Sequence, residues 1–391
     1  MAHRATPRFP LYVGGFLGPF GGAMLQPLIP AVADGLDTTI GLVAASITAY
    51  MIPFASLQLV SGTIGERLGP ARVVRTAYLV FGCASLVAAF APDIWTFIGA
   101  RSLTGAANAF LTPILLAALS ETVPPEVLGR TVGTFAAVQV AGLTLAPALG
   151  GALGEVSWRL GFALVAVVAF ALVLTKLEVS RRAPDRPRAR LRSLLRGRLA
   201  LLSAQAATGY LGFTSIGFLV TLVCVDVFEL GSGLTGLVVA TYGVGGMVFG
   251  RYAGAVVDRA GRPRTSLLGV TGCGLGVLAL AFVPGPWSFA LVYFAIGCGS
   301  AFAWAGLNTI VVERFPENRA GSVSVYSAFK FVGVAIAPLV YVPLYHSDVA
   351  LPFLVAAGAS GICALLVLPW FRIYARMPVS PGAPRIGTGE G

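Results

Sequence analysis

The chain has 391 residues, of which 57% are hydrophobic and only 11% are charged, and it carries a formal net charge of +11. Soluble domains carry about a quarter charged residues, so a chain of this composition cannot cover a surface that faces water, and a lipid bilayer is the expected solvent. The basic residues fall in loops between apolar segments, which argues against a nucleic-acid partner.

Twelve apolar segments follow one another along the chain, each long enough to cross a bilayer as a helix of about 20 residues. Helices are expected because every backbone amide inside a bilayer must find its partner within the segment. The segments lie at about 10–33, 38–62, 72–91, 94–119, 130–153, 160–178, 199–225, 233–256, 265–284, 287–311, 321–344 and 349–371.

The placement of lysine and arginine predicts the orientation, since cytoplasmic loops are enriched in these residues. With the N-terminus inside, almost all basic loop residues become cytoplasmic and only Arg159 falls on the outer side. The even number of helices returns the C-terminus to the same side. We therefore expect a multi-pass protein of the cytoplasmic (inner) cell membrane, with both termini in the cytoplasm.

The segment 179–198 divides the chain near its midpoint. It is basic and contains prolines, so it is predicted to be a cytoplasmic linker. The linker separates an N-terminal six-helix bundle, 1–178, from a C-terminal six-helix bundle with a cytoplasmic tail, 199–391.

The two halves repeat each other in sequence. The run from Gly62 to Arg72 recurs 192 residues later, from Gly254 to Arg264. Duplicated halves with the same orientation fit parallel repeats that are related by an axis along the membrane normal. The predicted fold class is therefore an all-α membrane protein, with twelve transmembrane helices in two pseudo-symmetric six-helix bundles.

Two of these segments resemble motifs of the major facilitator superfamily. The repeated loop resembles its G-x-x-x-D-R-x-G-R-[RK] motif, with Glu66 in place of the aspartate in the first copy and Asp258 in the second. The run that begins at Arg101 resembles its R-x-x-Q-G motif, with Thr104 in place of the glutamine. The resemblance covers nearly the whole chain and implies the major facilitator fold and solute transport by alternating access.

The loop motif places an acidic side chain beside the positive N-terminus of the next helix, with arginines nearby. Its residues are predicted to form conformational latches that hold the outward-facing state closed at the cytoplasmic side. They are Gly62, Glu66, Arg67 and Arg72 in the first half, and Asp258, Arg259 and Arg264 in the second. The alternative is a solvated turn whose basic residues serve only the topology.

A third motif lies in the fifth predicted helix. It resembles the G-x-x-x-G-P-x-x-G-G motif of twelve-helix drug:proton antiporters, with one glycine replaced by alanine. Its residues are Gly142, Ala146, Pro147, Gly150 and Gly151. Small residues allow helices to pack closely. The resemblance implies proton-coupled drug efflux, whereas close packing alone would need no antiport.

Two basic residues, Arg101 and Lys330, remain inside predicted spans, where an unpaired charge is unfavourable. Arg101 is expected either to serve proton coupling or anion binding, or to hold helices together through backbone carbonyls. Lys330 is expected to face a cavity as a proton carrier or as the partner of an anionic group of the solute. The alternative for Lys330 is snorkelling toward an interface.

The acidic residues pose a difficulty, since no carboxylate lies clearly at midspan. Asp34 and Asp226, near the outer ends of the first and seventh helices, are the candidates for a coupling group, and the alternative is helix-end solvation. The cavity should therefore favour anionic, zwitterionic or neutral polar solutes over lipophilic cations. The predicted cavity residues are Arg101, Lys330, Asn108, Gln139, Tyr326, Asn308, Trp304, Gln26, Asp34 and Asp226.

These patterns predict a secondary active transporter that moves a small solute by alternating access, as proton-coupled efflux. The alternative is an uptake symporter or uniporter for an anionic or neutral polar metabolite. An enzyme or a non-transporting sensor is disfavoured, because the chain has no Ser/His/Asp, His-cluster or phosphate-loop constellation. The five cysteines lie in apolar runs without metal-ligand spacing, so no metal or cofactor is expected. The predicted partners are the solute, membrane lipid and protons, and the chain is predicted to be a monomer.

Overall fold

The computed structural model describes residues 9–121, 123, 125–175, 197–315 and 319–375, and every regular element within them is a helix. In the first half these are α1 (Phe9–Ala23), the 3-10 turn η1 (Gln26–Leu28), α2 (Ile29–Gly35), α3 (Ile40–Leu68), α4 (Pro70–Ala89), α5 (Ile94–Glu121), α6 (Pro125–Gly154) and α7 (Trp158–Val173). In the second half they are α9 (Arg198–Gly209), the π-helical η2 (Tyr210–Thr214), α10 (Gly217–Asp226), α11 (Ser232–Ala260), α12 (Arg262–Leu280), α13 (Pro286–Arg314), α14 (Arg319–Ser347) and α15 (Leu351–Ala375). Of the predicted linker 179–198, all but the last two residues lie outside the described ranges.

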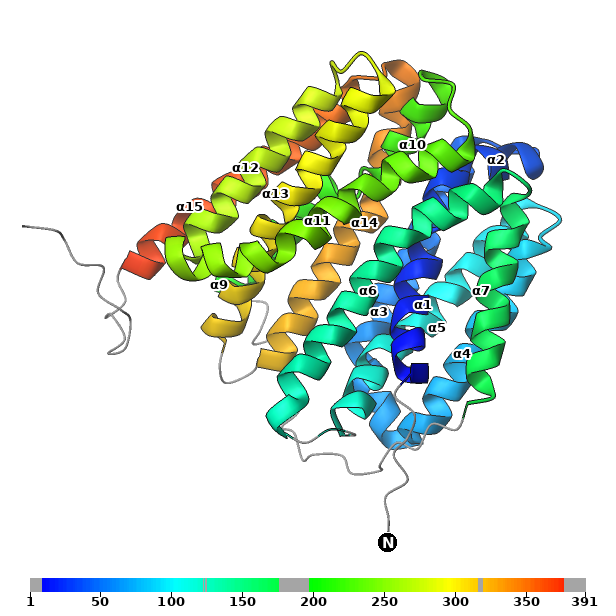
Figure 1. Ribbon diagram of the computed structural model, residues 1–391, viewed down its shortest axis with the longest axis horizontal. Coiled ribbons are helices and arrows are strands. Elements are labelled where there is room, and N and C mark those ends of the chain that lie inside the picture. Colours follow the sequence, from blue (N-terminus) through cyan, green and yellow to red (C-terminus); the bar gives the residue numbers. More distant parts are fainter. Residues whose placement is uncertain (1–8, 122, 124, 176–196, 316–318, 376–391) are drawn as a thin grey trace, which may run out of the picture.

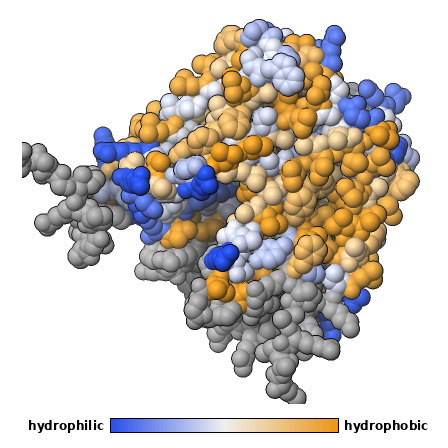
Figure 2. All heavy atoms as spheres, viewed as in Figure 1, coloured by the Kyte–Doolittle hydropathy of each residue, from blue (hydrophilic) through white to orange (hydrophobic). Residues whose placement is uncertain are grey.

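The described helices supply the predicted membrane spans. Eleven segments are long and apolar enough to cross a membrane, with α1 to α2 counted as one span and α9 to α10 as another, and α7 is a shorter apolar helix. Large apolar side chains remain exposed on the outer faces of these helices, and Figure 2 shows them as a broad apolar surface over the flank of the molecule. An apolar exterior of this extent fits lipid, so the prediction of a multi-pass, all-α membrane protein is confirmed.

Two spans that the sequence predicted as continuous helices are interrupted. The first breaks at η1, where Pro27 has no backbone N–H to donate. The seventh widens into the π-helical turn η2 before α10 begins at Gly217. Since these are the first spans of the two halves, the interruption is itself part of the internal repeat.

The helices form two bundles that pack against each other along two seams (Figure 1). In the first bundle, α5 packs against α3 and α4, α7 against α4, and α1 against α6. In the second, α13 packs against α11 and α12, α15 against α12, and α9 against α14. The bundles meet where α6 packs along α11 and α3 along α14.

Contacts across the seams concentrate at one end of the molecule, which we call the sealed end. It contains the first residues of α3 and α11 and the last residues of α6. There the Thr48 hydroxyl of α3 donates to the Ala335 carbonyl of α14 at 2.6 Å. The backbones of α6 and α11 touch so closely that a Cβ added to Gly151 would overlap the Ser232 carbonyl oxygen.

The bundles part toward the opposite end, which we call the open end. Three glycines at seven-residue intervals lie on one face of α11 and trace the separation. A Cβ at Gly236 would overlap the Pro147 carbonyl, and one at Gly243 would overlap the Thr144 side chain. A Cβ at Gly250, closer to the open end, would meet nothing within 4 Å. Figure 2 shows the resulting hollow between the bundles.

Candidate functional site

Arg101 lies inside the first bundle, seven residues after α5 begins and therefore about 10 Å from the sealed end of that helix. Its side chain is 1% exposed, and its guanidinium group donates to the Gly21 carbonyl at 3.0 Å and to the Gly22 carbonyl at 3.5 Å. These carbonyls belong to the last turn of α1, where a helix leaves acceptors unpaired. The guanidinium also lies over the rings of Tyr50, at 4.5 Å, and Phe162, at 5.9 Å. These are the contacts of an arginine that joins α5 to the break in the first span.

Asn108 and Gln139 form separate polar contacts in the same bundle. Asn108 Nδ2 donates to the Tyr50 hydroxyl at 2.7 Å, while its Oδ1 is buried without a hydrogen-bond partner among the described residues. A Cβ at Gly18 would overlap that oxygen, so the glycine makes room for the amide. Gln139 Nε2 of α6 donates to the Thr112 hydroxyl of α5 at 3.1 Å.

Lys330 lies near the middle of α14, eleven residues after its start at Arg319, which places it about 16 Å along the helix from the open end. It is partly exposed, and its Nζ donates to Asn308 Oδ1 of α13 at 2.9 Å. The next residue, Phe331, packs its ring edge-on against Phe54 of α3 at 4.6 Å. Lys330 therefore lies, partly exposed, directly before a residue that packs across the seam between α3 and α14.

Three rings surround the Lys330 ammonium group, and we call them the aromatic cluster. The distances from Nζ to the ring centroids are 4.5 Å for Tyr326, 5.3 Å for Trp304 and 5.8 Å for Tyr210. The sequence singled out Tyr326 and Trp304 as cavity residues but missed Tyr210, which lies in the π-helical turn η2. No local sequence signal marks that turn, since its residues could equally continue the helix.

The π-helical turn also holds the aromatic cluster in place. The hydroxyl group of Thr214 lies 3.3 Å from Trp304 Nε1, which donates to it, and 3.3 Å from the Tyr242 hydroxyl. The rings of Tyr210 and Trp304 lie 4.7 Å apart. An interruption of the seventh span therefore positions two of the three rings that contact the lysine.

The remaining predicted cavity residues lie at the sealed end. Gln26 lies in η1, and its side chain would contact a Cβ at Gly217 of α10 at 2.5 Å. Asp34 is exposed near the end of α2, and Asp226 ends α10, where it accepts a hydrogen bond from the Tyr345 hydroxyl at 3.0 Å. The structure thus brings Lys330, Asn308, Trp304 and Tyr326 together, but it does not bring the two aspartates to them.

The residues of the motif in α6 lie on two faces of that helix. Gly142 and Gly150 face α1, since a Cβ there would lie 2.5 Å from the Phe16 carbonyl oxygen and 2.7 Å from the Met24 carbonyl oxygen. Pro147 and Gly151 face α11 across the seam, and Ala146 is fully buried between helices. The motif therefore joins three helices at the sealed end.

An acidic residue of the first bundle caps a helix of the second. Glu155 follows α6, and its Oε1 accepts from the backbone N–H of Gly233 at 2.6 Å and from the Ser232 hydroxyl at 3.2 Å. The first N–H groups of a helix lack intrahelical partners and carry partial positive charge, so a carboxylate stabilises them. The sequence does not predict this role of Glu155, because the contact joins residues that are 78 positions apart.

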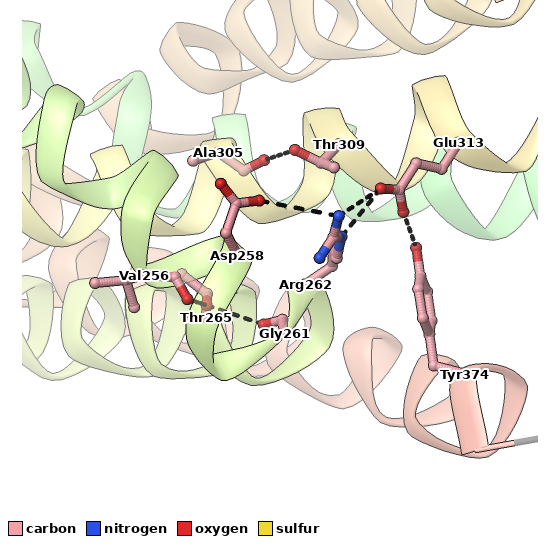
Figure 3. A network of polar contacts seen from close by, with 9 residues as sticks. All are labelled: Val256, Asp258, Gly261, Arg262, Thr265, Ala305, Thr309, Glu313 and Tyr374. Carbon is pink, nitrogen blue, oxygen red and sulfur yellow. Dashed lines mark hydrogen bonds and ion pairs between the residues drawn. The ribbon is translucent and has the colours of Figure 1, made fainter. Parts of the chain in front are cut away.

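A polar network closes the turn between α11 and α12 at the open end (Figure 3). Arg262 donates to Glu313 of α13 through Nε at 3.1 Å and Nη2 at 2.8 Å, and it lies 4.0 Å from Asp258. The Tyr374 hydroxyl of α15 donates to the same glutamate at 3.0 Å. The network therefore ties α12, α13 and α15 within one bundle, and among the described residues no partner comes from the other bundle.

The predicted latch residues take only a small part in this network. Asp258 contributes with a side chain that is 77% exposed, whereas Arg259 and Arg264 are exposed outside it and Arg262 occupies the bonded position. In the first copy, Arg67 and Arg72 are exposed, and the side-chain environments of Gly62 and Glu66 lie outside what the structure describes. The signal that was available for Glu313 was its spacing of 192 residues from Glu121.

Comparisons with known proteins agree with this architecture. The profile of the family described as Major Facilitator Superfamily matches residues 11–235 and 202–388. The multi-drug resistance efflux pump PmrA homolog of Lactococcus lactis is 25% identical over 350 residues, covering 85% of this chain and 86% of that protein. The multidrug resistance protein MdtG of Salmonella heidelberg is 26% identical over 372 residues, covering 89% of this chain and 91% of that protein.

Two solved structures share the fold at low sequence identity. A D-xylose-proton symporter superposes with a TM-score of 0.74 at 15% identity, covering 92% of this chain and 96% of that one. The nucleoside transporter NupG superposes with a TM-score of 0.78 at 14% identity, covering 93% and 99%. At these identities the likeness extends to the arrangement of the helices and not to the chemistry of the site.

Proposed function

Because the chain belongs to the Major Facilitator Superfamily, we propose that it is a secondary active transporter that expels a small solute across the cytoplasmic membrane in exchange for protons. The solute enters the hollow from the open end and leaves after the sealed end has opened. The observation that carries this proposal is the position of Lys330, a partly exposed cation near midspan beside the contact of Phe331 with Phe54 across the seam. A charge at that depth is unfavourable unless it is paired or hydrated, so a cation that stays partly exposed there is a candidate contact for a solute or an ion.

The distribution of arginine supports an open end that faces the cytoplasm. Of the described arginines near helix ends, Arg159 lies at the sealed end. Those near the open end are Arg67, Arg72, Arg75, Arg130, Arg198, Arg259, Arg262, Arg264, Arg314, Arg319 and Arg372. Because cytoplasmic loops are enriched in basic residues, both chain termini and the mouth of the hollow belong to the cytoplasmic side.

Efflux rather than uptake is supported by the two relatives that are named for multidrug resistance, which cover most of this chain. Proton exchange is supported by the α6 motif that resembles antiporters. The alternative is an uptake symporter or a uniporter for an anionic or neutral polar metabolite. It is favoured by the location of Asp34 and Asp226 at the sealed end, away from Lys330.

In this proposal the two bundles, 1–178 and 199–391, which the linker 179–198 joins in sequence, turn against each other, and the chain acts as a monomer. When the open end closes, the exposed Asp258 and its neighbouring arginines meet the first bundle as a latch. In the state described here, Asp258 instead lies 4.0 Å from Arg262.

A vesicle experiment tests the coupling. Inverted membrane vesicles that contain the protein are acidified inside, and norfloxacin, ethidium or naphthalenesulfonate is added outside while an internal pH dye is recorded. Antiport predicts that a transported solute dissipates the proton gradient, and that a protonophore abolishes uphill accumulation. Accumulation that persists unchanged without a proton gradient would rule out the exchange.

A further inference from the structure

The charge of Lys330 has no acidic partner among the described residues, where both ion pairs belong to Arg262. Its Nζ contacts one amide oxygen, that of Asn308, and the three rings of the aromatic cluster. Cation–π contacts and one neutral acceptor compensate only part of what a charge loses on leaving water. The site therefore holds a positive charge that a bound anion would complete.

The surroundings of this charge are aromatic rather than polar. Tyr210 and Trp304 are partly exposed and lie 4.7 Å apart by ring centroids. The residue after the lysine, Phe331, packs against Phe54 across the seam. The nearby Thr214 hydroxyl already contacts both Trp304 and Tyr242, so it offers little further hydrogen bonding.

This combination selects among classes of solute. A flat apolar ring system can pack against Tyr210 and Trp304, and a single negative group can reach the lysine ammonium. An organic cation would bind next to a like charge in a setting of low dielectric, which opposes binding. A sugar-like solute needs many hydrogen bonds, whereas in the aromatic cluster the Tyr326 hydroxyl is buried without a partner among the described residues, and polar groups buried without partners weaken binding.

We infer that the solute is an aromatic organic anion, whose carboxylate, sulfonate or phosphate group binds Lys330 and whose ring packs against Trp304 and Tyr210. This inference rests on the proposed transport function and names the substrate class of its site. It contradicts no comparison, since the relatives are named for drug resistance without a solute charge.

A matched pair of ligands tests the inference directly. Naphthalenesulfonate and trimethylnaphthylammonium share one ring system and carry opposite permanent charges. Calorimetric titration of the purified, detergent-solubilised protein is expected to show the anion binding at least tenfold more tightly than the cation. Equal affinity, or tighter binding of the cation, overturns the inference without any need for a variant.

Substitutions at Lys330 and Trp304 test which of them binds the charged group of the solute and which binds its ring. Lys330→Met removes the charge from an unbranched side chain only one atom shorter and should weaken naphthalenesulfonate binding at least tenfold, while Lys330→Arg should retain most of it. Trp304→Leu should weaken naphthalenesulfonate severalfold but leave the weak binding of methanesulfonate, which has no ring, unchanged. If Lys330→Met binds the anion as the wild type does, the lysine is not the anion site.

Binding and counterflow exchange without a proton gradient separate this inference from the proposed coupling. Anion binding and exchange that show no link to protons would leave the substrate class standing and overturn the antiport. Proton-coupled efflux of trimethylnaphthylammonium together with absent anion binding would support the antiport and overturn the aromatic anion as the substrate class.

Discussion

Arg101 and Lys330 are both cations within membrane-spanning helices, yet they belong to regions of opposite character. Arg101 is 1% exposed, and its fork of donors contacts two carbonyls at the end of α1. Lys330 is partly exposed, and its ammonium group contacts one amide oxygen and three aromatic rings. Because Arg101 Nε is also buried without a hydrogen-bond partner among the described residues, the two cations differ in exposure rather than in complete pairing. Exposure is what favours Lys330 as the proposed solute contact.

The largest effect is expected from the removal of Arg101, which tests whether this residue is structural. Arg101→Leu leaves the Gly21 and Gly22 carbonyls without a donor inside the membrane, and each buried unpaired group costs about 1–3 kcal/mol. We expect most of the folded protein to be lost in fluorescence-detected size exclusion, and the melting temperature of the remainder to fall by at least about 5 °C.

Arg159→Leu is the matched control, because Arg159 also donates to two backbone carbonyls, of Ala89 at 2.7 Å and of Ala91 at 3.3 Å. It lies near the sealed end, partly exposed, where water can replace it. Equal losses of stability in the two variants would show that burial does not distinguish these arginines.

The second test removes Lys330, and here we expect transport to change rather than stability. Lys330→Ala is expected to reduce transport by at least about tenfold, which corresponds to roughly 1.4 kcal/mol, while the melting temperature changes little. Activity is measured by solute flux in vesicles and stability by thermal melting, with Arg159→Ala as the control for flux. A large loss of stability, or equal loss of flux in both variants, would place Lys330 with Arg101 as a structural residue.

The sealed and open ends of the seam can be compared through two glycines. Gly151→Ala puts a methyl group into the Ser232 carbonyl, so we expect it to disfavour the sealed conformation, whereas Gly250→Ala meets nothing within 4 Å and should behave like the wild type. Spin labels at the exposed positions Asp37 and Asp348, one in each bundle, report the separation at the sealed end. An unchanged distance distribution in Gly151→Ala would show that the seam accommodates the added methyl group without opening.

The smallest effect is expected at the start of α5, the helix that carries Arg101. Asp93 accepts from the backbone N–H and hydroxyl of Thr96 and from the N–H of Trp95, and these bonds hold the pKa of its carboxyl below the ordinary value. A lowered folded-state pKa stabilises the protein above the unfolded pKa of about 4, and this stabilisation disappears as the pH falls through the folded value.

Asp93→Asn should therefore lower the melting temperature slightly at pH 7, and the difference from the wild type should shrink on acidification toward pH 3. Thermal melts of both proteins across that range check the sign. A difference that grows on acidification would mean that the carboxylate does not stabilise this helix start.

Hydropathy and spacing were sufficient to predict the twelve spans and their duplication, because both follow from the composition of segments. The same patterns could not predict how a residue is paired. Whether Arg101 faces a cavity or a backbone depends on the break at η1, since the end of α1 exposes the carbonyls that it binds. Similarly, Tyr210 joins Lys330 only because η2 is π-helical, which no residue pattern indicated.

Contacts between bundles were also beyond sequence reasoning. Glu155 precedes the turn into α7, and nothing near it in the chain reveals that it caps α11, 78 residues away. In the loop motif, the pattern pointed to Arg259 and Arg264, but the direction of the helix start gives the bond with Glu313 to Arg262. Long-range pairing of this kind depends on tertiary geometry, which local periodicity does not contain.

The seam between α6 and α11 has a consequence for how the sealed end can open. Where Gly151 and Gly236 meet the opposite helix, main chain lies against main chain with no side chain between them. No rotamer change there can admit a hydrated ion between these two helices, so opening this seam requires their main chains to separate. The resistance of this seam is therefore set by the stiffness of the packed helices, rather than by the thermal motion of a single side chain.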